Sequence, residues 1–90
     1  MLDIILSNQF KKDLKLASKR GYKLDLLDAV VTKLAAGESL PEKNRDHELI
    51  GDYAGFRECH IQPDWLLIYK IDNNELILFL SRTGTHSDLF

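Results

Sequence analysis

The apolar residues change their spacing near Phe56, and this change constrains the fold more than any other feature of the sequence. Three short runs rich in β-branched and aromatic residues follow it, namely FRECHIQ, WLLIYKI and ELILFLSRT. Runs of this kind, bounded by turn residues, predict β-strands. QPDW and DNN separate them, and we expect tight turns there, with the asparagines taking positive φ. The C-terminal part is therefore predicted to be an antiparallel meander of three strands.

Before Phe56 the apolar residues recur at the spacing of α-helices. One helix, which Ser7 or Asn8 can cap and Gly21 can end, carries an apolar stripe of Phe10, Leu14 and Ala17. A second helix ends at Gly37 and carries Leu24, Leu27, Val31 and Leu34 at spacings of three and four. The two helices are expected to form a hairpin.

The remaining segments complete the predicted order of elements. Asp3–Leu6 is a short apolar run that suits a strand, and 38–55 is a polar stretch that suits a long loop with a turn near Gly51. The order is strand, helix, helix and then three strands. This order predicts an α+β fold in which the helix hairpin packs on one face of the sheet.

Length and composition fit one globular domain over residues 1–90. The chain is 44% hydrophobic and 29% charged, and 90 residues cannot divide into two cores. Cys59 is the only cysteine, so no internal disulfide forms, which suits a reducing compartment. The start MLDIILSN is unlike a secretory signal, and no apolar run is long enough to span a membrane. We therefore expect a cytoplasmic protein.

The charge is distributed unevenly. The net charge of -2 argues against a generic nucleic-acid binder. The first helix and its end nevertheless carry a basic face, opposite the apolar stripe, made of Lys11, Lys12, Lys15, Lys19 and Lys23. Its simplest interpretation is a solvated helix face.

Side chains that can carry out chemistry are concentrated in the second half of the chain. The three histidines lie there, with Asp64 and the single tryptophan, and they are His47, His60 and His86. Their spacing matches no zinc-binding pattern, and Cys59 should face away from His60 across the sheet. We therefore expect no metal site, and we expect Cys59 to be a core residue. Taken singly, each histidine is more often a surface residue, Trp65 a core residue and Asp64 a turn former.

Three stretches together resemble a known family. They are DHELIG, the H-x-x-x-D-W run of His60, Asp64 and Trp65, and RTGTH followed by a final LF. They resemble the YafQ branch of the RelE/ParE superfamily of bacterial toxins, and the likeness covers nearly the whole chain. The resemblance implies a RelE-like fold, with an N-terminal strand, a helix hairpin packed on an antiparallel sheet and the three-strand meander.

The resemblance also implies an acid-base group. It is made of His47, His60, Asp64 and His86. Metal-free RNA cleavage needs one group to take the proton of the 2′-OH and another to protonate the leaving 5′ oxygen. We favour His86 as the general acid. The general base stays open among Asp64, His60 and His47.

The implied binding residues are Arg82 on the scissile phosphate and Trp65 and Phe90 against RNA bases. Gly84 would permit the close turn that directs His86 over the sheet. Arg57 resembles a further phosphate-binding position, although strand alternation points it away from His60 unless the strand is bulged.

Members of this branch are the toxin halves of toxin-antitoxin pairs that enter the ribosomal A site and cut mRNA without a metal. The resemblance therefore implies an endoribonuclease without a cofactor. Its partners would be the ribosome, mRNA and a cognate antitoxin, which we expect to be a ribbon-helix-helix DNA-binding protein. The lysine face would then contact ribosomal RNA.

Two other classes of function are kept as alternatives. The ParE branch has a similar fold but inhibits DNA gyrase without catalysis, and the three histidines argue against it. A plain protein-binding module predicts that replacing those histidines affects only stability.

Overall fold

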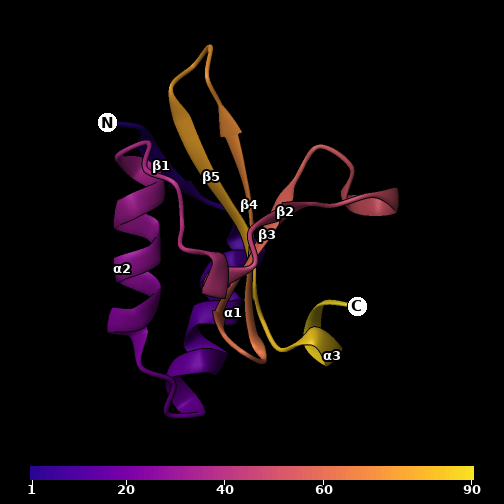
Figure 1. Ribbon diagram of the computed structural model, residues 1–90. Coiled ribbons are helices and arrows are strands. Elements are labelled where there is room, and N and C mark those ends of the chain that lie inside the picture. Colours follow the sequence, from indigo (N-terminus) through magenta and orange to yellow (C-terminus); the bar gives the residue numbers. More distant parts are fainter.

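A five-stranded mixed sheet forms the centre of the computed structural model, which describes residues 1–90 (Figure 1). The strands are β1 (Asp3–Leu6), β2 (His47–Glu48), β3 (Arg57–Gln62), β4 (Trp65–Asp72) and β5 (Ile77–Gly84). Their spatial order is β1-β5-β4-β3-β2. The three long strands are antiparallel neighbours, which confirms the predicted meander.

The helix hairpin covers one face of this sheet, as predicted. It consists of α1 (Asn8–Lys19) and α2 (Leu24–Ala35). Ser7 caps α1, because its Oγ accepts the N–H of Phe10 at 2.9 Å. Gly21 and Gly37 follow the two helices at φ 77° and 78°, the left-handed conformation that ends a helix at little cost when no Cβ is present.

The main core lies between the hairpin and the sheet. Apolar side chains of α2 pack there against alternate residues of the strands, which are Cys59, Trp65, Leu67, Tyr69, Leu78 and Leu80. Phe10 contributes the apolar stripe of α1. Burial of this face removes the apolar area of both helices from water, and it leaves the lysines of α1 exposed on the opposite side.

The N-terminal strand is where the predicted sheet differs from the observed one. β1 pairs with β5, and the two strands are parallel, with Asp3 opposite Ile77 and Leu6 opposite Leu80. The sheet is therefore mixed, and the prediction of an antiparallel sheet holds only for β2 to β5. The alternation of apolar residues within β1 indicates which face of the strand is buried. It does not indicate whether a partner strand far along the chain runs parallel or antiparallel to it.

Two short elements were not predicted, and one predicted turn has a different backbone conformation. The two-residue strand β2 lies inside the polar segment, between 3₁₀ turns at Glu42–Asn44 and Gly51–Tyr53. After β5 the chain forms α3 (His86–Leu89), on the face of the sheet away from the hairpin (Figure 1). The β4–β5 turn takes positive φ at Leu76, at 55°, and not at the asparagines, while Asp72 Oδ1 accepts the N–H groups of Asn74 and Glu75.

A second, smaller core lies beneath α3. Leu89 packs there on Leu66 and Ile68, with Leu49, Tyr53 and Phe56 around them. This cluster fixes α3 and the segment around β2 on the sheet face that the hairpin leaves open. None of the helices combines the length and the apolar character that crossing a membrane requires.

Candidate active site

The open face of the sheet carries two rows of ladder partners that include predicted site residues. His47, Glu58, Ile68 and Arg82 are successive ladder partners across β2, β3, β4 and β5. His60, Leu66 and Gly84 form the adjacent row. Neighbouring strands are about 4.8 Å apart, so the first row extends over about 14 Å. The strand register therefore brings residues far apart in sequence onto one surface.

A buried carboxylate lies between two of the histidines. Glu58 Oε1 is 3.5 Å from His47 Nε2 and 3.8 Å from His60 Nε2. The Glu58 side chain is 8% exposed, whereas those of His47 and His60 are 49% and 20% exposed. The two histidines therefore remain accessible from solvent, while the carboxylate beneath them does not.

Main-chain carbonyls fix the other nitrogen of each ring. His47 Nδ1 lies 2.7 Å from the carbonyl oxygen of Arg45, and His60 Nδ1 lies 3.2 Å from that of Pro63. A carbonyl oxygen only accepts, so each Nδ1 must carry the proton of the bond. In the neutral ring, Nε2 then holds the free lone pair and can act as a base.

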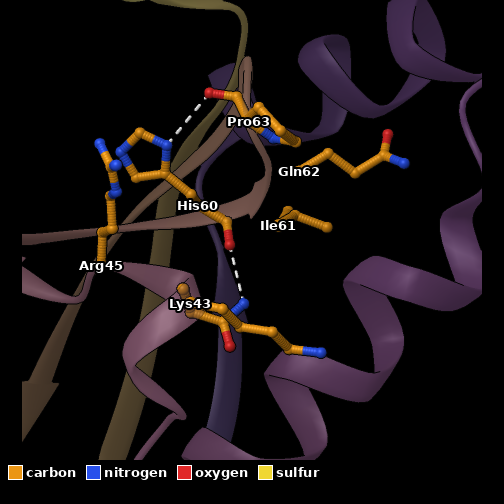
Figure 2. Close-up of a pocket in the computed structure, with 7 residues that line it drawn as sticks. Lys43, Arg45, His60, Ile61, Gln62 and Pro63 are labelled. Carbon is orange, nitrogen blue, oxygen red and sulfur yellow. Dashed lines mark hydrogen bonds between the residues drawn. The ribbon is translucent and has the colours of Figure 1, made fainter.

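His60 also lines a pocket of about 470 Å³ beside the β3–β4 turn (Figure 2). Asn44 holds the strand there, because its Nδ2 donates to the carbonyl oxygen of His60 at 2.8 Å. Lys43 and Arg45 line the same pocket, so a cationic rim stands next to the histidine.

His86 begins α3, and several contacts fix its place. Its backbone N–H donates to Asp64 Oδ1 at 3.1 Å, so the β3–β4 turn is joined directly to α3. Thr85 and Asp88 form a capping box, and Arg20 makes two hydrogen bonds to Asp88. A Cβ at Gly84 would come within 3.0 Å of Asp88, which explains why the chain needs glycine there.

Aromatic rings form a chain across the open face. Phe90, 55% exposed, lies with its ring centroid 5.1 Å from His86 and 5.7 Å from Tyr53. Tyr53 contacts Phe56, and Phe56 contacts Phe79. Phe90 is thus held against two neighbours and still presents half of its surface to a ligand.

Arg82 is anchored by a carboxylate from α1. Its Nε and Nη2 donate to the two oxygens of Asp13, each at 3.1 Å, and this pairing raises the pKa of Arg82 despite partial burial. The backbone N–H of Thr83 and the Gln9 amide also donate to Asp13. Asp13 therefore occupies the side of the guanidinium that carries Nε and Nη2.

Trp65 does not lie where the resemblance placed it. It is 1% exposed, its Nε1 donates to Thr83 Oγ1 at 2.8 Å, and its ring lies 4.9 Å from that of Tyr22. The predicted contact with RNA bases is therefore corrected, because the indole belongs to the core under the hairpin. Its position in the alternation of β4 places it on the side of Leu67, away from Leu66.

Arg57 and Cys59 also face the hairpin side, as strand alternation predicts. Arg57 Nε donates to Asp46 at 3.3 Å, and Tyr69 donates to the same carboxylate oxygen. Burial by itself would lower the pKa of Arg57, but the hydrogen bonds with Asp46 and Tyr69 outweigh burial, and the pKa is raised. Cys59 is fully buried, and burial raises the pKa of its thiol to about 12, so the prediction of a core cysteine is confirmed.

Two residues of the site were missed from the sequence, although each left a signal. Glu58 lies two positions before His60 in a strand, which places both on one face. Asp13 is buried between Phe10 and Ala17, on the apolar side of α1, where a charge is costly unless it has a partner. No group of three or more His, Cys, Asp or Glu side chains has the arrangement of a metal site. A metal-free reaction stays a prediction.

A helix hairpin covers one sheet face, and histidines, an arginine and aromatic rings lie on the other, which is the RelE-like fold that the sequence resemblance implied. Comparison with known proteins narrows this class. The model of the family described as "Bacterial toxin of type II toxin-antitoxin system, YafQ" matches residues 2–90. The chain therefore belongs to the YafQ family of bacterial toxins.

Individual relatives agree with this assignment. The mRNA interferase toxin YafQ of Escherichia coli K12 is 43% identical over 89 residues, which cover 98% of this chain and 95% of the relative. The crystal structure of a metal-bound toxin from Helicobacter pylori is 50% identical with a TM-score of 0.94, over the full length of both chains. The toxin in the crystal structure of the E. coli DinJ-YafQ complex is 42% identical with a TM-score of 0.91, over 100% of this chain and 99% of that one.

Proposed function

We propose that this chain is an endoribonuclease, the toxin of a type II toxin-antitoxin pair that cuts mRNA in the ribosomal A site. One observation carries the proposal: the open face holds accessible histidines, an anchored arginine and an exposed aromatic ring. The mRNA interferase name of the E. coli relative supports it.

The reaction needs no group beyond these side chains. The 2′ oxygen attacks the adjacent phosphorus and loses its proton to a general base, while the bond from phosphorus to the 5′ oxygen breaks and that oxygen takes a proton from a general acid. The products are a 2′,3′-cyclic phosphate and a free 5′-OH. Cations nearby stabilise the negative charge of the phosphorane.

His86 serves as the general acid in this proposal; α3 lies on the open face, and Asp64 holds the His86 backbone there. His60 or His47 serves as the base. Each has a proton on Nδ1 and a free Nε2, which is the state a base requires. Asp64 is less suited to this role, because one of its oxygens already accepts the His86 N–H.

Arg82 binds the phosphate through the side of its guanidinium that Asp13 leaves free. Phe90 stacks on a base, since half of its surface is open and its neighbours hold the ring. Arg57 contacts RNA only if it exchanges Asp46 for a phosphate, and we assign it to the edge of the site.

The partners follow from the same proposal. The lysine face of α1 contacts ribosomal RNA, and this contact weakens as salt rises. A cognate antitoxin, of the ribbon-helix-helix type, blocks the toxin, as the DinJ-YafQ complex of the E. coli relative suggests. A toxin that acts on ribosomes works in the cytoplasm, and this is the location that we propose.

His86→Ala tests the proposal, with Ser87→Ala as the matched control on the same helix. General acid-base groups contribute about 10² to 10⁴ in rate, so single-turnover cleavage of ribosome-bound mRNA should fall by that range in His86→Ala. The thermal midpoint and ribosome binding should stay near those of the wild type, and Ser87→Ala should cleave normally. Wild-type cleavage by His86→Ala would remove His86 from the mechanism. Undisturbed translation with inhibited DNA gyrase would refute the function itself.

A further inference from the structure

Glu58 has a structural anomaly that the proposed reaction does not yet use. Its Oε2 is the only buried side-chain oxygen or nitrogen without a hydrogen-bond partner in the protein. A buried carboxylate oxygen without a donor destabilises a fold, and an amide or apolar side chain would pack there at lower cost. Such a group is retained for a reason other than stability.

The surroundings of Glu58 indicate what that reason is. Oε1 lies 3.5 Å from His47 Nε2 and 3.8 Å from His60 Nε2. Both distances exceed that of a normal N–H···O hydrogen bond, so neither Nε2 is committed to the carboxylate. In their neutral forms both nitrogens present lone pairs, since each Nδ1 carries its proton toward a carbonyl.

Glu58 therefore makes no hydrogen bond to a neutral ring, but it lies close enough to pair with a charged one. When either ring accepts a proton, a positive charge forms within 4 Å of a carboxylate that water hardly reaches. Two cationic side chains, Lys43 and Arg45, line the pocket beside His60 and oppose a positive charge on its ring, whereas Glu58 is a buried carboxylate within 4 Å of both rings. Arg82 is two strands away in the same row, about 10 Å, and the Lys70 ammonium lies over the ring of Phe56.

We infer that Glu58 is a positioning residue that acts through His47 and His60: it stabilises the imidazolium formed when one of them takes the 2′-OH proton. The inference rests on the proposed function and assigns its general base to this histidine pair. The proton moves from the 2′ oxygen to Nε2, the carboxylate remains ionised, and its charge compensates the new positive charge.

Glu58→Gln is the variant that tests this role, because it keeps the volume and removes the charge. Glu75→Gln, an exposed carboxylate in the β4–β5 turn, is the control. We expect Glu58→Gln to cleave ribosome-bound mRNA about 10 to 100 times more slowly, with unchanged half-saturation by ribosomes. Its thermal midpoint should equal or exceed that of the wild type, since an unpaired buried carboxylate is gone. Glu75→Gln should match the wild type in every measurement.

Two readouts separate this role from a structural one. Glu58→Gln should not slow the double variant His47→Ala/His60→Ala any further, because the carboxylate acts only through these rings. NMR of the imidazole rings should show that His47 and His60 protonate at lower pH in Glu58→Gln, whether or not RNA is present.

An unchanged protonation midpoint together with wild-type cleavage would overturn the inference, and so would a lower thermal midpoint that accounts for the loss of activity. If the wild type cleaves nothing on ribosomes, the proposed function fails, and the NMR titration still decides the role of Glu58.

Discussion

Replacing Trp65 by phenylalanine separates the core role of this side chain from a role in RNA binding. The structure gives the indole one hydrogen bond, to Thr83 Oγ1, and the Thr83 hydroxyl donates in turn to the carbonyl oxygen of Leu66 at 2.7 Å. Phenylalanine keeps the ring in the core but cannot donate. The lost bond costs about 1 kcal/mol and the smaller apolar area about 1 kcal/mol more.

A loss of about 2 kcal/mol lowers the thermal midpoint of a domain of this size by about 8 to 16 °C. Circular dichroism measures this shift. Cleavage at a temperature well below both midpoints should then be within about threefold of the wild type, because the indole is 1% exposed and lies in the core.

Two further variants sharpen the test. Thr83→Val removes the acceptor, and a double-mutant cycle with Trp65→Phe should give a coupling of about 1 kcal/mol. Phe90→Leu should behave in the opposite way, with near-normal stability and impaired cleavage, since its ring is half exposed. A tenfold loss of cleavage by Trp65→Phe at an unchanged thermal midpoint would refute the assignment of Trp65 to the core.

Two other predictions concern charge. The first variant replaces three exposed lysines of α1 by glutamate, namely Lys11, Lys15 and Lys19. It should bind ribosomes more weakly and with a flatter salt dependence while remaining folded, and sedimentation at several salt concentrations measures this. Equal binding would identify the stripe as a solvated face. Hydrogen bonds from Arg20 and Thr85 hold the pKa of Asp88 well below its usual range. A carboxyl group with a lowered pKa stabilises the fold above its unfolded pKa, about 4, and this contribution disappears as the pH falls toward the folded pKa. The difference in thermal midpoint between the wild type and Asp88→Asn should therefore shrink between about pH 5 and pH 2, and a constant difference would contradict this.

Regular spacing made most of the fold predictable. Apolar residues recur at the strand period in the meander and at the helix period in both helices. The helix ends were predictable because Ser7 can cap a helix and glycine takes positive φ at Gly21 and Gly37. β2 and α3 were missed because two and four residues are too few to show a period. The parallel pairing of β1 depends on a partner that only the tertiary structure supplies.

The site was predictable where residue type carries the chemistry. Histidines and arginines drew attention to the open face, and strand alternation placed Cys59 and Arg57 on the other side of the sheet. The same rule applied along β4 would have assigned Trp65 to the core, but the likeness to a family outweighed it. Glu58 was overlooked because a carboxylate in a strand is usually exposed, and only the ladder register shows it beneath two histidines.

The pairing of β1 with β5 sets the order in which the chain can fold. A hydrogen bond of 2.7 Å joins Ser7 and Ser81, which are 74 positions apart in the sequence. Arg82 likewise donates a hydrogen bond to Asp13, 69 positions away. Contacts this remote require closure of nearly the entire chain, which is entropically costly and slows folding. During synthesis β1 and α1 emerge long before their partner strand, so their apolar surfaces remain uncovered until β5 follows. The arginine and α3 arrive with that last strand, and no nascent chain can hold a complete site before β5 is made.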